Sequence, residues 1–263
     1  MADTIFNKNE LILDRVRNVS FSDLYTKKLL LRLTSVEDPS LGCTAEGEEI
    51  VDAIGSLITT LYRAKKATFS GSNSLVSLDL AAAQYGSKKE IAGVDGVASV
   101  PTRAYEIIDI AKGTKLAHEP VDGSIKWIYT IDKGEIGTAY AVGSAASDDT
   151  AVVATDGTIT LPTGVTEGSI YVEYIYESKD AVKVVNKASE FPKAGSLVIH
   201  AYFRDKCTEE LYSGAIICPK AKLNPESVEL ALTSTGKHPF EFTMMKDYCD
   251  DVNDELFSIV ISK

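Results

Sequence analysis

The chain has 263 residues, of which 44% are hydrophobic and 25% charged, so it can bury a core and is not a disordered chain. Its formal net charge of −11 argues against a protein that reads nucleic acid or docks on an anionic membrane, because both surfaces repel acids. Four scattered cysteines, no secretory signal and no apolar run near the ~20 residues of a membrane span predict a reduced protein in solution.

The start of the chain predicts an arm, a strand and a long loop. Residues 1–28 are mixed and polar, so we expect an arm with at most a short helix. Residues 29–33 read LLLRL and predict a short strand. Residues 34–49 carry five acids, one proline, two glycines and no base, which is loop composition. A loop of this length is usually functional or mobile.

A hairpin and a helix are predicted next. Residues 50–70 are rich in β-branched and aromatic residues and are interrupted by Gly55, which favours two strands joined by a tight turn. The segment from Asn73 to Gly86 has apolar residues at helical spacing, which predicts a helix. Asn73 and Ser74 are its candidate N-caps, and Gly86 is placed to end it.

The middle region, residues 101–190, combines turn signals with strand-like runs. Asp-Gly pairs at 122–123 and 156–157 predict tight hairpins. Strands are predicted at residues 125–131, 158–161 and 169–177. In the last of these, alternation places four residues on one face: Ile170, Val172, Tyr174 and Tyr176.

The C-terminal part, residues 191–263, continues the β pattern. Five strands are predicted, at residues 196–203, 212–219, 227–232, 240–245 and 256–261. Cys218 lies in an apolar run and is expected to pack as a small apolar residue. Many short strands with one helix predict a mainly β protein, a sandwich or barrel with a single flanking α-helix.

Patterns that carry chemistry are absent from the sequence. His118, His200 and His238 are far apart, and neither a nucleophile elbow nor a phosphate loop is present. The acidic run 249–255 resembles half of a calcium loop but lacks its central glycine, so a solvated turn is the simpler interpretation. The tyrosines of 169–177 suggest either a sugar-binding platform or a strand with one buried face. We therefore expect that the protein is not an enzyme and that it binds no cofactor and no metal ion.

Two parts of the chain resemble the tail tube proteins of long-tailed bacteriophages. The C-terminal run GAIICPKAKLNPESVELALTSTG, followed by PFEFTMMKDYCDDVNDELFSIVI, is similar to the ending of that family. The N-terminal hairpin around Asp52, Gly55 and Ser56, the strand KKATFSG and the helix LVSLDLAAAQYGS resemble its beginning. On this resemblance, residues 1–100 and 191–263 build the tube sandwich. The less typical middle region is then an enlarged part of the sandwich or an inserted immunoglobulin-like unit.

The resemblance implies a structural virion protein of the tail, assembled in the host cytoplasm. Family members stack as rings, usually hexameric, in which each subunit adds strands to an inner β-barrel. The implied partners are copies of the chain itself, a tape-measure protein, a tail terminator and, in a contractile tail, a sheath. DNA passes through the channel during ejection without specific binding, and no membrane is involved.

Candidate site residues follow from that picture. We expect the hairpin of residues 48–70 to line the channel, with these lumen or assembly candidates: Glu48, Glu49, Asp52, Gly55, Lys65 and Lys66. An acidic wall would let DNA slide, because duplex DNA is densely charged and a basic wall would hold it. We expect residues 34–49 to contact the next subunit along the tube, through Glu37, Asp38 and Glu46.

Two other functions remain alternatives to a tube subunit. One is a head decoration protein or another capsid-associated β-sandwich. The other is an immunoglobulin-like module that binds a glycan or a peptide. Tubes with a central channel in negative-stain micrographs would favour the tube subunit, whereas binding to empty heads would favour decoration. Glycan binding by a stable monomer would favour the binding module.

Overall fold

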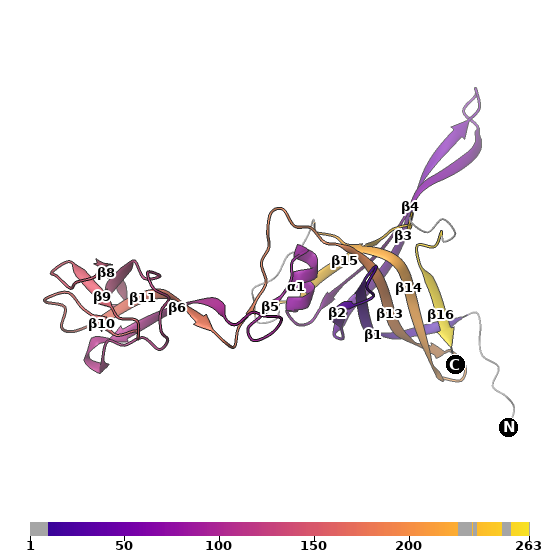
Figure 1. Cartoon of the computed structure of the whole chain (residues 1–263). Helices are drawn as coiled ribbons and strands as arrows, with labels where there is room; N and C mark the ends of the chain where they lie inside the picture. The colour runs from indigo at the N-terminus through magenta and orange to yellow at the C-terminus, as the bar shows by residue number, and fades with distance from the viewer. Residues whose placement is uncertain (1–9, 226–232, 234–235, 249–253, 263) are drawn as a thin grey trace. The chain divides into compact units, whose positions relative to one another are not determined.

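The computed structural model describes residues 10–225, 233, 236–248 and 254–262 (Figure 1). The chain divides into two compact units, one made of Met1–Lys89 and Val184–Lys263 and the other of Glu90–Lys183. The strand predicted at 227–232 and most of the acidic run 249–255 lie outside the described residues. Both units are built mainly from β-strands, as the sequence predicted.

The first unit is one antiparallel eight-stranded sheet that curls into a half-barrel (Figure 1). Its strands lie in the order β2-β1-β13-β14-β15-β4-β3, and β16 pairs with β14 beside β15. The strands are β1 (Leu11–Asp23), β2 (Leu29–Leu33), β3 (Val36–Val51), β4 (Leu57–Asn73), β13 (Ala194–Asp205), β14 (Leu211–Leu223), β15 (His238–Met244) and β16 (Ser258–Ser262). Pairing of β1 with β13 and of β4 with β15 joins the two ends of the chain in one sheet.

One face of this sheet forms the core, because apolar residues alternate along its strands. The phenylalanine rings meet at its centre, with Phe242 5.2 Å from Phe21 and 6.5 Å from Phe69 between ring centroids. Cys218 is buried in this core, as predicted, and burial raises the pKa of its thiol to about 11. Its weak nucleophilicity at neutral pH fits a packing role.

Within the described parts of the chain there is one α-helix, α1 (Leu78–Tyr85), and it packs Leu80 against this core. It begins three or four residues later than the two predicted caps, since Ser77 is the N-cap and its Oγ accepts a hydrogen bond from the Leu80 N–H at 3.2 Å. Asn73 instead ends β4. The helix ends at Gly86 as predicted, with φ 70°, a conformation that favours glycine. No helix among the described residues has the length and apolar character needed to cross a membrane.

Two sequence predictions for the N-terminal region were wrong. Within the expected arm, residues 11–23 form strand β1, which was not recognisable in the sequence because only Val19 and Phe21 of its residues are buried. The expected loop at 34–49 is mostly strand β3. β3 lies at the edge of the sheet with most of its side chains in water, so its acids cost little while its backbone pairs with β4.

The second unit is a six-stranded sheet with the order β10-β9-β8-β7-β11-β6. Its strands are β6 (Val100–Asp109), β7 (Trp127–Asp132), β8 (Glu135–Val142), β9 (Thr150–Val153), β10 (Ile159–Thr160) and β11 (Ser169–Ser178), with a 3-10 turn η1 (Ile110–Lys112). A short pair, β5 (Glu90–Ile91) and β12 (Val182–Lys183), brings its two ends together. The predicted face of β11 is confirmed: Ile170, Val172 and Tyr174 are buried, and Tyr176 packs against them.

The hairpin predictions in this unit were only partly right. The pair at 156–157 does turn between β9 and β10, with Gly157 at φ 82°. The pair at 122–123 also forms a turn, but it precedes β7 and joins no paired strands. The hairpin between β7 and β8 uses Lys133 and Gly134, both at positive φ, which is typical of a tight two-residue turn.

Candidate functional site

The most exposed element of the first unit is the far half of the β3–β4 hairpin, residues 44–66, here called the hairpin arm (Figure 1). β15 pairs with β4 only at residues 67–73, so the arm is a two-stranded ribbon among the described residues. All of its residues except Asp52 and Thr60 are exposed. An isolated two-stranded ribbon is marginally stable in water, which suggests that a partner supports it.

The arm carries large apolar side chains on both faces. They are Ile50, Val51, Ile54, Leu57, Ile58, Leu61 and Tyr62, each at least 39% exposed. Sequence reasoning identified this hairpin but did not single out these residues. Contiguous exposed apolar surface marks interaction sites, since it costs free energy to keep it in water. The arm therefore has the composition of a protein-binding element.

The tip of the arm is held by Asp52. Its carboxylate accepts hydrogen bonds from the Ile54 N–H at 2.9 Å and the Ser56 N–H at 2.7 Å. Gly55 lies at φ 86°, so the tight turn predicted there is present. Asp52 and Gly55 thus shape the turn, whatever surface the tip meets.

The other predicted residues of the hairpin lie along the arm. Glu48 forms an exposed ion pair with Arg63 at 3.4 Å, and Arg63 is also the cross-strand partner of Glu46. Glu49 is the next residue along β3, so it points to the opposite face from Glu48. Lys65 and Lys66 lie where the arm leaves the sheet.

That junction contains a β-bulge. The register of β3 and β4 shifts between Thr44 and Glu46, and Ala64 lies opposite the shift at φ 48°. A non-glycine residue in this region is uncommon, and bulges increase the local twist of a strand pair. The bulge therefore marks the place where the ribbon turns out of the sheet.

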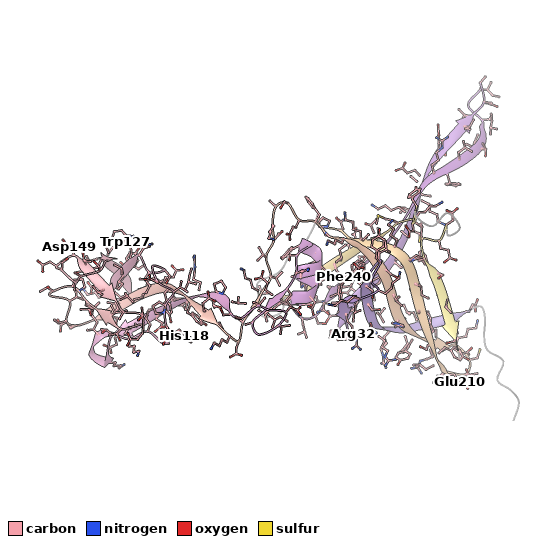
Figure 2. All side chains as sticks on the ribbon, in the orientation of Figure 1. Arg32, His118, Trp127, Asp149, Glu210 and Phe240 are labelled. Carbon is pink, nitrogen blue, oxygen red and sulfur yellow. The ribbon has the colours of Figure 1, made fainter. Side chains whose placement is uncertain are left out.

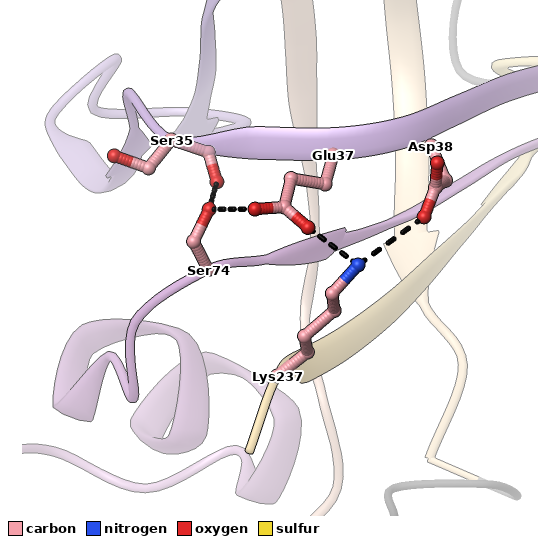
Figure 3. Close-up of polar contacts among 5 residues, drawn as sticks. All are labelled: Ser35, Glu37, Asp38, Ser74 and Lys237. Atoms are coloured by element: carbon pink, nitrogen blue, oxygen red, sulfur yellow. Dashed lines mark hydrogen bonds and ion pairs between the residues drawn. The ribbon is translucent and has the colours of Figure 1, made fainter. Parts of the chain in front are cut away.

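A polar network fixes the inner end of β3, as Figure 3 shows. Lys237 Nζ lies 2.5 Å from Glu37 Oε2 and 3.4 Å from Asp38 Oδ2. Ser74 Oγ donates to Glu37 Oε1 at 2.7 Å and also lies 3.1 Å from the carbonyl oxygen of Ser35. Hydrogen bonds from Lys237 and Ser74 lower the pKa of Glu37, while Glu37 raises the pKa of Lys237. Glu37 and Asp38 are thus tied to the sheet, whereas Glu46 lies on the arm.

The face of the large sheet opposite the core is rich in small polar side chains, which sequence reasoning missed. Neighbouring strands place them side by side, as for Thr68 opposite Thr243 and Ser22 opposite Ser196, while Ser70 lies opposite the carboxylate of Glu241. The signal in the sequence is the serine or threonine at every second position, as in ATFSGS of β4. This polar face is partly shielded from solvent, whereas the core face is fully buried.

Open strand edges are a second assembly feature of the first unit. Among the described strands, β2 pairs only with β1 and β16 pairs only with β14. Both edge strands expose apolar residues: Leu29 and Leu30 on β2, Ile259 and Val260 on β16. Unprotected edges of this kind offer unpaired backbone groups to another strand.

The buried histidine of the first unit is structural. His238 Nδ1 accepts a hydrogen bond from the Ser77 N–H at 3.2 Å, and its Nε2 lies 2.7 Å from Gln84 Oε1. Gln84 in turn donates to the carbonyl oxygen of Pro239 at 2.8 Å. Burial lowers the pKa of His238, so the neutral ring joins α1 to β15. Within the described residues, no three His, Cys, Asp or Glu side chains gather as metal ligands would.

Comparison with known proteins identifies a family. The YomU/Tube protein family matches residues 11–259, a span that includes strands of both units. No curated protein matches the chain.

Proposed function

Since this chain belongs to the YomU/Tube protein family, a phage tail tube family, we propose that it is a tail tube subunit that polymerises into stacked hexameric rings. The rings form the channel through which DNA is ejected. In the subunit itself, the observation that carries the proposal is the hairpin arm, a long exposed ribbon that presents seven large apolar side chains to solvent. A protein that worked as a monomer would gain nothing from exposing this surface.

Ring closure is supported by the open edges of the half-barrel. In a closed ring, the edge strands of one subunit meet those of the next, and the sheets join into an inner β-barrel. Closure removes the unpaired edges of β2 and β16, which would otherwise promote aggregation. It also buries the apolar side chains that these strands expose, at about 25 cal/mol per Å² of apolar surface.

The arm is assigned to contacts between successive rings. It begins at the bulge beside Ala64, so it leaves the sheet instead of continuing the wall of the half-barrel. Burial of Ile58, Leu61 and their neighbours against the next ring would stabilise the stack. Glu48 and Asp52 near the tip then face the channel where two rings meet, whereas Glu49 points to the other face of the arm. The polar face of the sheet lines the rest of the channel.

Such a wall suits the passage of DNA. Serine and threonine side chains offer hydrogen bonds without a fixed charge, and Glu241 and the acids of the arm repel phosphates over roughly 8–10 Å. Lys222, the cross-strand partner of Thr243, places a base beside them. A wall of lysines would instead bind the duplex through many simultaneous contacts. The same proposal makes the protein part of the virion tail, assembled in the host cytoplasm. It would meet a tape-measure protein, a tail terminator and, in a contractile tail, a sheath.

If the hairpin arm joins successive rings, a single charge introduced into it should prevent the rings from stacking. Ile58→Glu changes a side chain that is 64% exposed, so the subunit should still fold, but a buried carboxylate should prevent stacking. Sedimentation and negative-stain microscopy should show tubes for the wild type and only subunits or single rings for the variant. Ile136→Glu is the matched control, since Ile136 is also 64% exposed but lies in the second unit. Normal tubes from Ile58→Glu would contradict the role of the arm.

A further inference from the structure

The second unit carries a row of three tyrosines, one exposed and two half-buried, on the outer face of its sheet. Tyr105, Tyr171 and Tyr129 come from the neighbouring strands β6, β11 and β7. The Tyr105 and Tyr171 rings are stacked with centroids 5.9 Å apart, and Tyr129 lies 6.3 Å from Tyr171. Tyr105 is 67% exposed. The other face of the same strands packs the core through Ile128, Ile170 and Val172, so the tyrosines lie outside the buried cluster.

A depression of about 190 Å³ adjoins this row. Tyr129 and Trp127 of β7 line it together with Arg103, Lys126 and Glu173. It forms because β7 pairs with β11 only along residues 169–172, so the rest of β11 continues beyond the end of β7. Trp127 is half-exposed at this end (Figure 2). Aromatic faces and charged groups therefore meet in one hollow.

We propose that this depression and the tyrosine row bind a saccharide. A pyranose ring has an apolar face of C–H groups, which stacks on aromatic rings, and a rim of hydroxyls that need donors and acceptors. Trp127 and Tyr129 supply the stacking surface. Arg103 and Lys126 donate hydrogen bonds, and Glu173 accepts them. Arg103 Nη1 lies 3.5 Å from Glu173 Oε1 in an exposed pair, so both groups can turn to a ligand at little cost.

The same features disfavour other ligands. The core of a protein–protein interface is depleted of charge, whereas three charged side chains lie inside this depression. A nucleic acid requires a basic surface, and the chain has a net charge of −11 with Glu173 in the hollow itself. The tyrosine row extends the site beyond the depression, with the Tyr105 and Tyr171 rings 28° from parallel, so it suits an oligosaccharide of β-linked pyranoses better than a single sugar.

The test uses the full-length protein and its own fluorescence. Trp127 is the only tryptophan in the chain, so a ligand in the depression changes its emission directly. The probes are chitotetraose and cellotetraose, with maltotetraose as a curved, α-linked comparison. We expect a saturable change with at least one β-linked probe, with a Kd of about 1 mM or tighter. No saturable change with either β-linked probe overturns the proposal.

Three substitutions locate the binding. Tyr129→Ala and Glu173→Gln should each weaken the affinity about tenfold. Tyr105 is exposed at the end of the row, so Tyr105→Ala should weaken the affinity for tetrasaccharides more than the affinity for disaccharides. Tyr25→Ala is the control, because Tyr25 is 83% exposed in the first unit. Thermal unfolding checks that each variant is folded. Affinities equal to the control in all three variants would overturn the assignment. The proposal stands apart from tube assembly, so a protein that forms no tubes can still pass this test.

Discussion

At the scale of single residues, several side chains that sequence reasoning proposed for function turn out to stabilise local structure. Asp52 holds the turn of the arm, and Glu37 is bonded to Lys237 and Ser74. These hydrogen bonds leave Asp52 and Glu37 able to take part in assembly as well, because both acids remain partly exposed. His238 is different, since it is buried and joins α1 to β15. Protonation of its ring therefore changes the free energy of unfolding directly.

His238 should make the first unit less stable in mild acid. Burial lowers its pKa below the ordinary 6.5, so the unfolded chain binds this proton at higher pH than the folded chain. Its contribution to the free energy of unfolding is complete above about pH 6.5 and is lost as the pH falls towards the folded pKa. Urea unfolding between about pH 8 and pH 5.5 measures this loss.

The matched variant is His238→Gln. It should be less stable than the wild type at about pH 8, because the packing around α1 is altered, but its stability should change less between pH 8 and pH 5.5. Other groups that titrate in this range remain in both proteins, so the difference between the two slopes isolates His238. Equal slopes would contradict the assignment.

At the scale of elements, the sequence predicted strands that have one apolar and one polar face. It missed strands whose two faces are similar in polarity. β11 was recognisable because Ile170, Val172 and Tyr174 alternate with polar residues and the alternate positions are buried. β3 was not, because an edge strand in water needs no apolar face and its acids imitate a loop. Of the candidate site, the sequence located the arm. It did not predict the network around Lys237, because that network joins segments that are far apart in the chain.

Shortening the arm should separate folding from assembly. Glu46 and Arg63 are cross-strand partners, so residues 47–62 can be replaced by Asn-Gly, a tight-turn sequence, without disturbing the sheet. Because the removed residues are almost all exposed, the free energy of unfolding should change by no more than about 1 kcal/mol. Sedimentation should show no tubes. A deletion of 36–47, by contrast, would remove most of β3 and test folding instead.

At the scale of the whole molecule, the second unit is a contiguous insertion with its own core. It comprises Glu90–Lys183, and Ile91 and Val182 pair at its two ends. Its buried residues form a cluster separate from that of the large sheet. The two units therefore have separate cores, and the assembly features described above all belong to the first unit.

Removing the second unit should leave tube formation intact. Ile91 and Val182 are cross-strand partners, so deleting residues 92–181 and joining them by a short Gly-containing turn keeps the ends in place. We expect tubes of normal length in micrographs and no saccharide binding. A protein that folds but no longer forms tubes would show that the second unit takes part in assembly.

If this chain forms a tube by closing its half-barrels into rings and joining successive rings with the hairpin arm, a cryo-EM reconstruction of the assembled wild-type protein should show a continuous inner β-barrel. The polar face, with Thr68, Ser70 and Thr243, should line its channel. Ile58 and Leu61 should be buried against the next ring. A reconstruction with the arm on the outer rim and these two side chains in solvent would overturn this assembly, as would a protein that remains monomeric.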